Sequence, residues 1–410
     1  MTDPNPLEPL VDRLRSQVIA PLVDRFVDKK EVVELLAVAS VAGENLLLLG
    51  PPGTAKSQIV QDFAAQLEGR YFECLLTRFS EPNELFGPVD LLKLKEGIVE
   101  TRTDGMLPDA DFAFLDEVFN GNSAILNSLL NILNERTFRR GRERHKLDLF
   151  SVVGASNRLP EDTALRALYD RFLVRIRCDA VADNSLPLLF DKGWKIEQAR
   201  IRGGGAGKRA GSAFTVRDLR ALCAQIPDID VDGIRQPYID LIRKIRGAGV
   251  PLSDRRVVRL LRLIAVSSLF CGRRQATPAD FWVLRYVWDS EAQAGVLDEI
   301  VTQTIRRYVE RADADGTSGK VHEMAVNRSS VSIVDLGKRF DELELRLQDA
   351  SLSRLERLEK KERMVELLRL CSWVIPLKAE DRAALETLKA QIKGRVDQLA
   401  KELQSGAIVS

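Results

Sequence analysis

The first 180 positions of the chain alternate between short apolar runs and longer amphipathic segments. The apolar runs lie at 46–49, 71–76, 112–115, 149–153 and 173–178. Such runs are typical of parallel strands that are covered on both faces. Between them, segments such as 57–67 and 123–133 repeat apolar residues every three or four positions, which predicts helices. Strands that alternate with helices predict an α/β domain with a parallel sheet over about residues 1–182.

After residue 182 the strand pattern ends and helical periodicity continues. Residues 183–310 predict an all-α subdomain, with helices at about 216–224, 237–246, 255–269 and 278–288. A glycine-rich basic stretch at 202–211 interrupts it. Glycine-rich segments are usually flexible connectors, and a pore or partner contact is the alternative interpretation.

The last hundred residues are polar at first and then strongly helical. Residues 311–335 are polar and predict a linker. From 336 to 410 the pattern is charged and amphipathic, with one helix at about 336–372 and a second one after Pro376. We interpret this part as a C-terminal helical hairpin or small bundle that docks a partner.

Composition limits the classes of function. The chain has 61 basic and 60 acidic side chains among 410 residues, so a dedicated nucleic-acid binder with a basic domain is not expected. Five scattered cysteines and two histidines argue against a zinc site and fit a reducing compartment. The first residues lack the pattern of a signal peptide, and no apolar stretch approaches the ~20 residues that span a bilayer. We therefore expect a soluble, cytoplasmic protein.

A predicted strand at 46–49 leads into a glycine- and proline-containing loop and then into a helix. The loop residues are Gly50, Pro51, Pro52, Gly53, Thr54, Ala55, Lys56 and Ser57. A phosphate chain needs backbone N–H donors, a helix N-terminus and one cation, and this order supplies all three. Lys56 would contact the β- and γ-phosphates of ATP, and the Ser57 hydroxyl would coordinate Mg²⁺.

Ala55 stands where the usual phosphate-loop pattern has glycine. Alanine accepts helical and bridge conformations, so the loop is compatible with Ala55 as long as its φ stays negative.

Two further strands end in polar residues. Asp116 and Glu117 follow the apolar run 112–115, and adjacent carboxylates at the end of a buried strand are costly unless they meet a cation or perform chemistry. We expect Asp116 to hold Mg²⁺ through water and Glu117 to orient and deprotonate the attacking water. Asn157, after the next strand, could hydrogen-bond that water and the γ-phosphate; a turn residue before Pro160 is the alternative.

These three strand ends, in this order, resemble the AAA+ superfamily. The sequences of the motifs are most similar to its MoxR family, in particular to a regulatory ATPase of that family. The loop with Ala55 is the form that family uses. Further matching segments are 77–88 (TRFSEPNELFGP), 115–117 (LDE), 124–130 (AILNSLL), 134–136 (NER), 155–161 (ASNRLPE) and 167–172 (ALYDRF). The resemblance implies a P-loop AAA+ sheet with helices on both faces, followed by an all-α lid at 183–310.

The resemblance also implies roles that spacing alone does not give. Members of the family assemble as hexameric rings with nucleotide between subunits. Arg171 resembles the arginine that reaches the γ-phosphate of the neighbouring subunit. Arg255 resembles a second sensor that contacts phosphate in cis, with Arg256 in reserve. The usual partner in this family is a protein with a von Willebrand factor A domain that carries a metal site on its surface.

Two inserted hairpins are expected to face the pore of such a ring. The first would run over 92–100 with its turn at Glu96 and Gly97, and the second over 137–144, which carries four arginines. The resemblance predicts an ATPase that remodels or chaperones protein complexes. A nucleic-acid motor related to ring helicases and a nucleotide-dependent assembly scaffold with low turnover remain the alternatives.

Overall fold

The structure is a computed structural model, and the chain divides into two compact units. It describes residues 8–95, 100–140, 143–160, 162, 165–202, 214–314, 320–327, 333–347, 352–372, 374–376 and 379–404. Unit 1 comprises 1–277 with 283–298, and unit 2 comprises 278–282 with 299–410. The glycine-rich stretch predicted at 202–211 lies outside the described residues except for Arg202.

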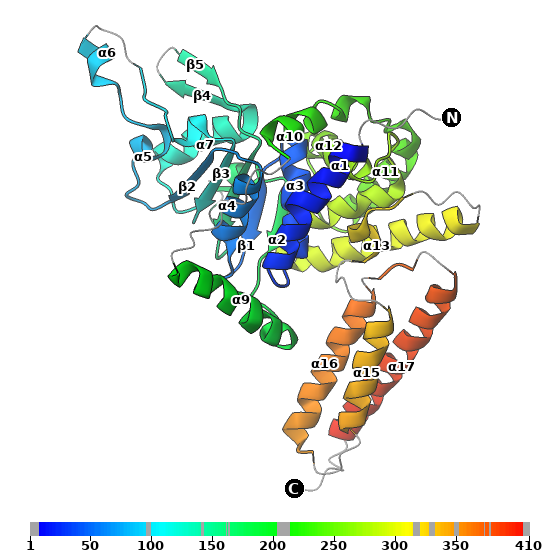
Figure 1. The fold of residues 1–410 in the computed structure, drawn as a ribbon. Helices are drawn as coiled ribbons and strands as arrows, with labels where there is room; N and C mark the ends of the chain where they lie inside the picture. The colour runs from blue at the N-terminus through cyan, green and yellow to red at the C-terminus, as the bar shows by residue number, and fades with distance from the viewer. Residues whose placement is uncertain are drawn as a thin grey trace. The chain divides into compact units, whose positions relative to one another are not determined.

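Unit 1 contains a five-stranded parallel sheet in the order β2-β3-β6-β1-β7 (Figure 1). The strands are β1 Leu46–Leu49, β2 Tyr71–Leu75, β3 Phe112–Asp116, β6 Ser151–Ser156 and β7 Val174–Arg177. Every residue of β1 and β6 is buried, as expected for central strands that helices cover on both faces. The register pairs Leu49 with Ser156 and with Arg177, so the carboxyl ends of these three strands lie at one edge of the sheet.

Helices connect the strands and build the rest of unit 1. They are α1 Glu8–Leu14, the π-helix η1 Arg15–Ile19, α2 Ala20–Arg25, α3 Lys30–Ala42, α4 Lys56–Gln66, α5 Pro82–Phe86, α6 Leu91–Lys95, η2 Leu107–Asp109, α7 Ser123–Glu135, α8 Arg166–Tyr169, η4 Asp183–Ser185, α9 Leu186–Ile201, α10 Val216–Cys223, η5 Ile226–Asp228, η6 Asp232–Ile234, α11 Arg235–Gly247 and α12 Asp254–Phe270. The segment expected as a helix at 278–288 is the 3-10 helix η7 Pro278–Tyr286.

The first predicted hairpin is wrong in its first strand, although the chain does return antiparallel, with the Asp90 amide donating to the carbonyl of Glu100 at 2.8 Å. Leu91–Lys95 forms α6 instead of a strand, because the Asp90 carboxylate accepts hydrogen bonds from the amides of Leu92 (2.8 Å) and Lys93 (3.3 Å) and caps the helix. Its predicted turn at Glu96 and Gly97 lies outside the described residues. The second hairpin is confirmed: β4 Thr137–Arg140 and β5 Glu143–Lys146 pair antiparallel.

Unit 2 is helical and ends in three helices instead of two. Its elements are α13 Glu291–Ala314 from residue 299 onward, then α14 Glu323–Val326, α15 Ile333–Leu347, α16 Arg354–Ser372 and α17 Ala379–Gln404. The end of α13, all of α14 and the start of α15 therefore lie within 311–335, where a linker was predicted. Leucines from α15, α16 and α17, with Met364, Ile392 and Cys371, form one apolar core.

The single helix predicted at 336–372 is wrong because a capping box starts a new helix at Arg354. The Ser353 hydroxyl accepts from the Glu356 amide at 3.3 Å, and the Glu356 carboxylate accepts from the Ser353 amide at 2.8 Å. Across the described residues, no helix combines the length and the apolar content needed to cross a bilayer.

Candidate nucleotide site

The predicted phosphate loop follows β1 at the carboxyl edge of the sheet. The amide of Gly50 donates to the carbonyl of Ser156 at 3.1 Å, which ties the start of the loop to β6. A Cβ atom on Gly50 would lie 2.3 Å from the backbone oxygen of Cys178. Only glycine therefore fits between β1 and the chain that leaves β7.

Lys56 is the first residue of α4 and is buried. Its ammonium donates to the carbonyl oxygens of Gly50 and Pro51, both at 2.8 Å. These partners are neutral, so the loop keeps the full positive charge of the lysine close to the N-terminus of α4. A buried cation that has no carboxylate partner among the described residues, beside a helix N-terminus, is suited to bind an anion such as a phosphate chain.

Ala55 corrects one expectation. Its φ is +65° and its ψ is 22°, so it lies in the left-handed region and not at the negative φ that the sequence argument required. For alanine, the left-handed backbone conformation costs about 1 kcal/mol or more in free energy. The loop therefore holds Ala55 in a conformation that glycine would adopt more easily, and strain of this kind is concentrated at functional sites.

The two carboxylates of the LDE segment lie where β3 ends. Asp116 is the last residue of β3 and accepts a hydrogen bond from the amide of Glu117 at 3.0 Å. Glu117 has a φ of +48°, a second non-glycine residue in the left-handed region. This turn sends the Glu117 side chain toward β6.

Glu117 and Asn157 are in direct contact. The Asn157 side-chain amide donates to Oε1 of Glu117 at 2.7 Å, which joins the carboxyl ends of β3 and β6. On the other oxygen, Oε2, Glu117 accepts from the side-chain amide of Asn120 at 3.3 Å. The sequence prediction brought Glu117 and Asn157 together and missed Asn120, whose position three residues after Glu117 was the available signal.

The surroundings of Glu117 suit this residue to act as a general base. Burial, followed by the charge of Asp116, raises the pKa of Glu117 above its ordinary value, while Lys56 and the hydrogen bond from Asn157 act in the opposite direction. A carboxylate with a raised pKa binds a proton more readily, which suits the acceptance of a proton from water. The influence of Lys56 also places the loop and the carboxylate in one electrostatic environment.

The donor set fits magnesium nucleotide. Among the described residues there is no group of three or more histidine, cysteine, aspartate and glutamate side chains that could hold a metal by itself. Mg²⁺ is typically bound by one or two protein oxygens together with phosphate oxygens and water. Ser57 and Asp116 can supply those protein oxygens, and bound Mg²⁺ would neutralise developing charge on the phosphates.

Arg171 lies at the opposite edge of the sheet. Its carbonyl accepts a hydrogen bond of 3.0 Å from the side chain of Asn45, the residue that precedes β1. The phosphate loop follows the other end of β1, and four strand residues span about 13 Å. The Arg171 guanidinium lies near Asp170, 3.4 Å away, and is separated from the phosphate loop of its own chain by the length of the sheet.

Arg255 and Arg256 have different surroundings. Arg256 is buried and donates to the Asp289 carboxylate at 2.8 Å, which is a structural role. Arg255 is exposed, and its pKa is lowered by partial burial first and then by the charges of Arg171 and Arg259. Arg255 is thus close enough to Arg171 for the two charges to interact, and the contact of Arg255 with phosphate in cis stays a prediction.

A buried charge cluster supports the amino edge of the sheet. Glu44 is fully buried and pairs with Arg259 and, at 3.5 Å, with Arg262. Burial is the main cause that raises the pKa of Glu44. Arg136 is half-buried, desolvation of its guanidinium lowers its pKa to about 10, and it donates to the carbonyl of Gly43 at 3.1 Å. Sequence reasoning missed this cluster, because residues so far apart carry no shared spacing.

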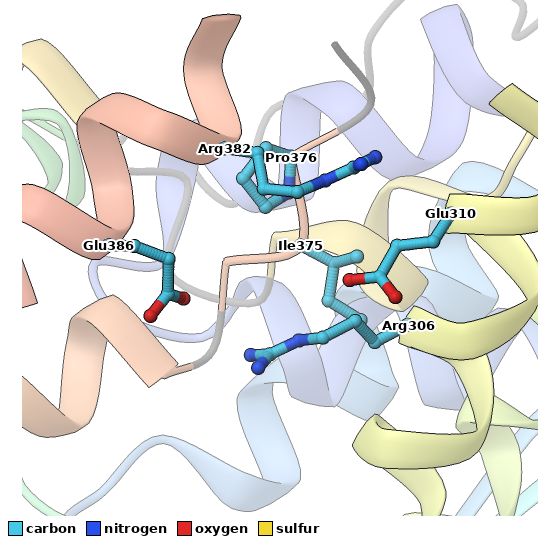
Figure 2. A pocket seen from close by; sticks show the side chains of 6 residues that line it. All are labelled: Arg306, Glu310, Ile375, Pro376, Arg382 and Glu386. Carbon is cyan, nitrogen blue, oxygen red and sulfur yellow. The ribbon is translucent and has the colours of Figure 1, made fainter. Parts of the chain in front are cut away.

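Unit 2 has a charged pocket of its own (Figure 2). The cavity measures about 160 Å³ and is lined by Arg306, Glu310, Ile375, Pro376, Arg382 and Glu386. Glu386 is paired with Lys389 at 2.9 Å, and this hydrogen bond is the main cause that lowers its pKa. The pocket is lined by two acidic and two basic side chains, so their charges balance. None of the lining residues belongs to the phosphate loop, and this pocket is therefore distinct from the nucleotide site.

Known families match both halves of unit 1. Residues 12–207 match the model described as the MoxR domain in the MoxR-vWA-beta-propeller ternary systems, and residues 234–301 match an AAA lid domain. The second match identifies the all-α region after the sheet as a lid.

Individual proteins agree with these matches. An uncharacterised protein of Methanocaldococcus jannaschii is 33% identical over 291 residues, which cover 70% of this chain and 73% of that protein. Protein MoxR of Paracoccus denitrificans is 24% identical over 274 residues, 60% of this chain and 79% of MoxR. A candidate ATPase from Cytophaga hutchinsonii has a similar fold, with a TM-score of 0.58, 19% identity, and coverage of 73% of this chain and 95% of that one. The chain belongs to the MoxR family of AAA+ ATPases.

Proposed function

We propose that this chain hydrolyses ATP with Mg²⁺ at the carboxyl edge of its sheet and uses the energy to remodel protein complexes. The observation that carries this proposal is the hydrogen bond between Glu117 and Asn157, near a buried Lys56 that donates to two neutral carbonyl oxygens. A strand end that joins a base, a polar amide and a cation suits phosphoryl transfer to water.

Each residue has a distinct task in this proposal. The loop amides from Gly50 to Ser57 and the Lys56 ammonium bind the phosphates, and Ser57 and Asp116 hold Mg²⁺. Glu117 orients the attacking water and takes its proton, while Asn157 fixes one carboxylate oxygen and leaves the other to act. Asn120 steadies the second oxygen as a positioning residue.

The site is completed by a second copy of the chain. Arg171 and Arg255 lie together at the amino edge, away from their own phosphate loop. Two arginines without an anionic substrate in their own chain are suited to reach the γ-phosphate held by a neighbour. We therefore assign both to action in trans, within a closed ring that the family resemblance suggests is a hexamer.

The partner is a protein with a von Willebrand factor A domain. Support comes from the description of the matching family model, which names MoxR-vWA ternary systems. The three-helix bundle of α15, α16 and α17 is available to dock such a partner. The chain would then act in the cytoplasm as a chaperone-like regulator, similar to the regulatory ATPase RavA of this family.

Changing Glu117 to Gln tests the proposed function. This substitution keeps the shape and removes the base, so ATP binding should persist while hydrolysis falls by roughly 10² to 10⁴-fold, the usual contribution of a general base. Nucleotide affinity is measured with a fluorescent ATP analogue and turnover by phosphate release. Hydrolysis at the parental rate would show that another residue is the base.

The nucleic-acid alternative is tested in the same assay. Hairpin β4–β5 carries arginines at 139, 140, 142 and 144, and a motor that uses it on DNA would hydrolyse ATP faster when DNA is added. A large stimulation that declines with salt would favour that alternative over protein remodelling.

A further inference from the structure

Helix α9 has no buried residue among those whose exposure the structure describes. This is unusual for a helix of 16 residues with so many large apolar side chains. The most exposed are Phe190 (73%), Ile201 (69%) and Trp194 (53%). Isolated helices of this length are marginal in water, so α9 gains stability only if something covers it.

Six of the seven exposed large apolar side chains of α9 share one face, and Leu188 (47% exposed) is the one that lies outside this set. At 100° per residue they fall within about half of the helix circumference. The set is Leu186, Leu189, Phe190, Trp194, Ile196 and Ile201. Exposed apolar patches of more than a few hundred Å² mark interaction sites, and each aromatic side chain alone can bury about 150–250 Å².

The position of α9 relates this face to the nucleotide site. The chain leaves β7 beside the phosphate loop, where the amide of Cys178 donates to the carbonyl of Leu49 at 2.7 Å. It then reaches α9, whose approach is held by hydrogen bonds from Ala182 (3.2 Å) and Ser185 (3.1 Å) to Asp28. Helix α9 therefore extends from the carboxyl edge of the sheet, the edge that carries Lys56 and Glu117 (Figure 1).

We propose that the apolar face of α9 binds the amino edge of a second copy of this chain. This inference rests on the proposed function, in which Arg171 and Arg255 of one copy serve the phosphate loop of another. For them to do so, the amino edge of the second copy must lie against the carboxyl edge of the first, which is the edge from which α9 extends. The contact is head-to-tail, and such interfaces close into rings.

The second copy offers a matching surface on α12. Val258 is 66% exposed and lies three residues after Arg255 and four before Arg262, so the three side chains share a helix face. The exposed Val258 supplies an apolar contact for α9 while Arg255 remains directed to phosphate and Arg262 stays paired with Glu44. A stable interface takes about 800 Å² from each partner, to which the α9 face contributes a large share.

A membrane surface fits α9 less well. Helices that lie in a membrane interface oppose their apolar face with a strongly basic one. At 100° per residue, the other side of α9 carries Asp191, Lys192 and Lys195, whereas Glu197 falls within the sector of the apolar residues. Lys192 is paired with Asp24 at 2.7 Å. This mixture of charge favours a protein surface.

The first test compares two double variants of the full chain by sedimentation velocity, with and without a non-hydrolysable ATP analogue and Mg²⁺. Phe190→Glu with Trp194→Glu should shift assembly to at least tenfold higher protein concentration, with nucleotide affinity within twofold of the parent. The control, Leu345→Glu with Leu355→Glu, charges two leucines of similar exposure (69% and 66%) in unit 2 and should assemble like the parent.

Three outcomes would overturn the proposal: a parent chain that stays monomeric at all concentrations, an α9 variant that assembles like the parent, or equal loss of assembly in the control. None of them depends on hydrolysis, so the Glu117→Gln result tests the proposed function separately.

A photo-crosslinking amino acid at position 190 identifies the occupant. In a mixture of isotopically light and heavy chains, we expect crosslinks between copies that map to α12 around Val258. Crosslinks to any other part of a second copy would contradict the assigned surface. Flotation with phosphatidylcholine–phosphatidylglycerol vesicles that requires Phe190 and Trp194 would assign the face to a membrane and overturn the proposal.

Discussion

At the scale of single residues, the site depends on backbone conformations that most side chains avoid. Ala55 and Glu117 both have positive φ, at +65° and +48°, and they flank the two ends of the catalytic region. Each such residue costs on the order of 1–3 kcal/mol and persists only where its surroundings fix it. Buried β1 and β3, whose ends lead into these turns, provide that rigidity.

The pKa of Glu117 predicts how activity depends on pH. Burial and the charge of Asp116 raise this pKa. The value of kcat/KM should therefore fall on acidification, and the midpoint of that fall should lie above the ordinary glutamate pKa of about 4.3. The active form is the ionised one, so activity is present above the raised pKa and is lost below it. The profile of kcat/KM reports the free enzyme and is the measurement to make.

Asn157→Ala provides the matched comparison for this profile. Its hydrogen bond lowers the pKa of Glu117, so its removal should move the acid limb of the remaining activity to higher pH. An acid limb that stays in place or moves to lower pH would contradict the assignment of Glu117 as the base.

At the scale of elements, the buried Glu44 joins the sheet domain to the lid. It lies between α3 and β1, and its partners Arg259 and Arg262 come from α12. Breaking a buried ion pair by removal of one partner leaves the other charge uncompensated. The connection therefore fixes the position of α12, and with it Arg255, at the amino edge of the sheet.

Glu44→Ala should strongly destabilise unit 1. The substitution leaves Arg136 and Arg259 close together without their carboxylate, so we expect a loss of about 3–5 kcal/mol in the free energy of unfolding. Urea unfolding measures this loss. The control is Asp240→Ala, which removes an exposed pair with Arg243 (3.3 Å) and should cost less than about 1 kcal/mol. Similar losses in both variants would mean that the buried cluster contributes little.

At the scale of the whole molecule, the sheet separates the two sets of residues that we propose to form one active site. Lys56, Glu117 and Asn157 lie at its carboxyl edge, and Arg171 and Arg255 lie at its amino edge. Because the strands are parallel and in register, no local rearrangement brings the two sets together within one chain. Under the proposed function, hydrolysis therefore requires at least two copies.

Mixing two inactive variants tests this requirement. Arg171→Ala and Glu117→Gln should each be nearly inactive alone, with Arg171→Ala reduced by roughly 10³-fold as for other arginines that act in trans. In mixed assemblies, an intact Arg171 from one variant faces an intact Glu117 from the other, so phosphate release should recover part of the parental rate. A mixture that stays as inactive as its components would place Arg171 in cis.

Much of the site could be predicted because its residues are close in sequence to strand ends. The order of apolar run, polar residue and helix placed Lys56, Asp116, Glu117 and Asn157 at one edge, since the ends of parallel strands must meet there. Predictions failed where a single side chain decides local structure. The caps made by Asp90 and Ser353 turned a predicted hairpin into α6 and split one predicted helix into α15 and α16.

The sequence by itself determined the family, the parallel sheet and the set of residues at the carboxyl edge, because these follow from periodicity and from motifs of adjacent residues. Only the tertiary structure decided the positive φ of Ala55, the burial of Arg256 against Asp289 and the position of Arg255 beside Arg171. It also decided that no described residue of α9 is buried. These features depend on contacts between segments tens to hundreds of residues apart, and a one-dimensional pattern carries no information on such distances.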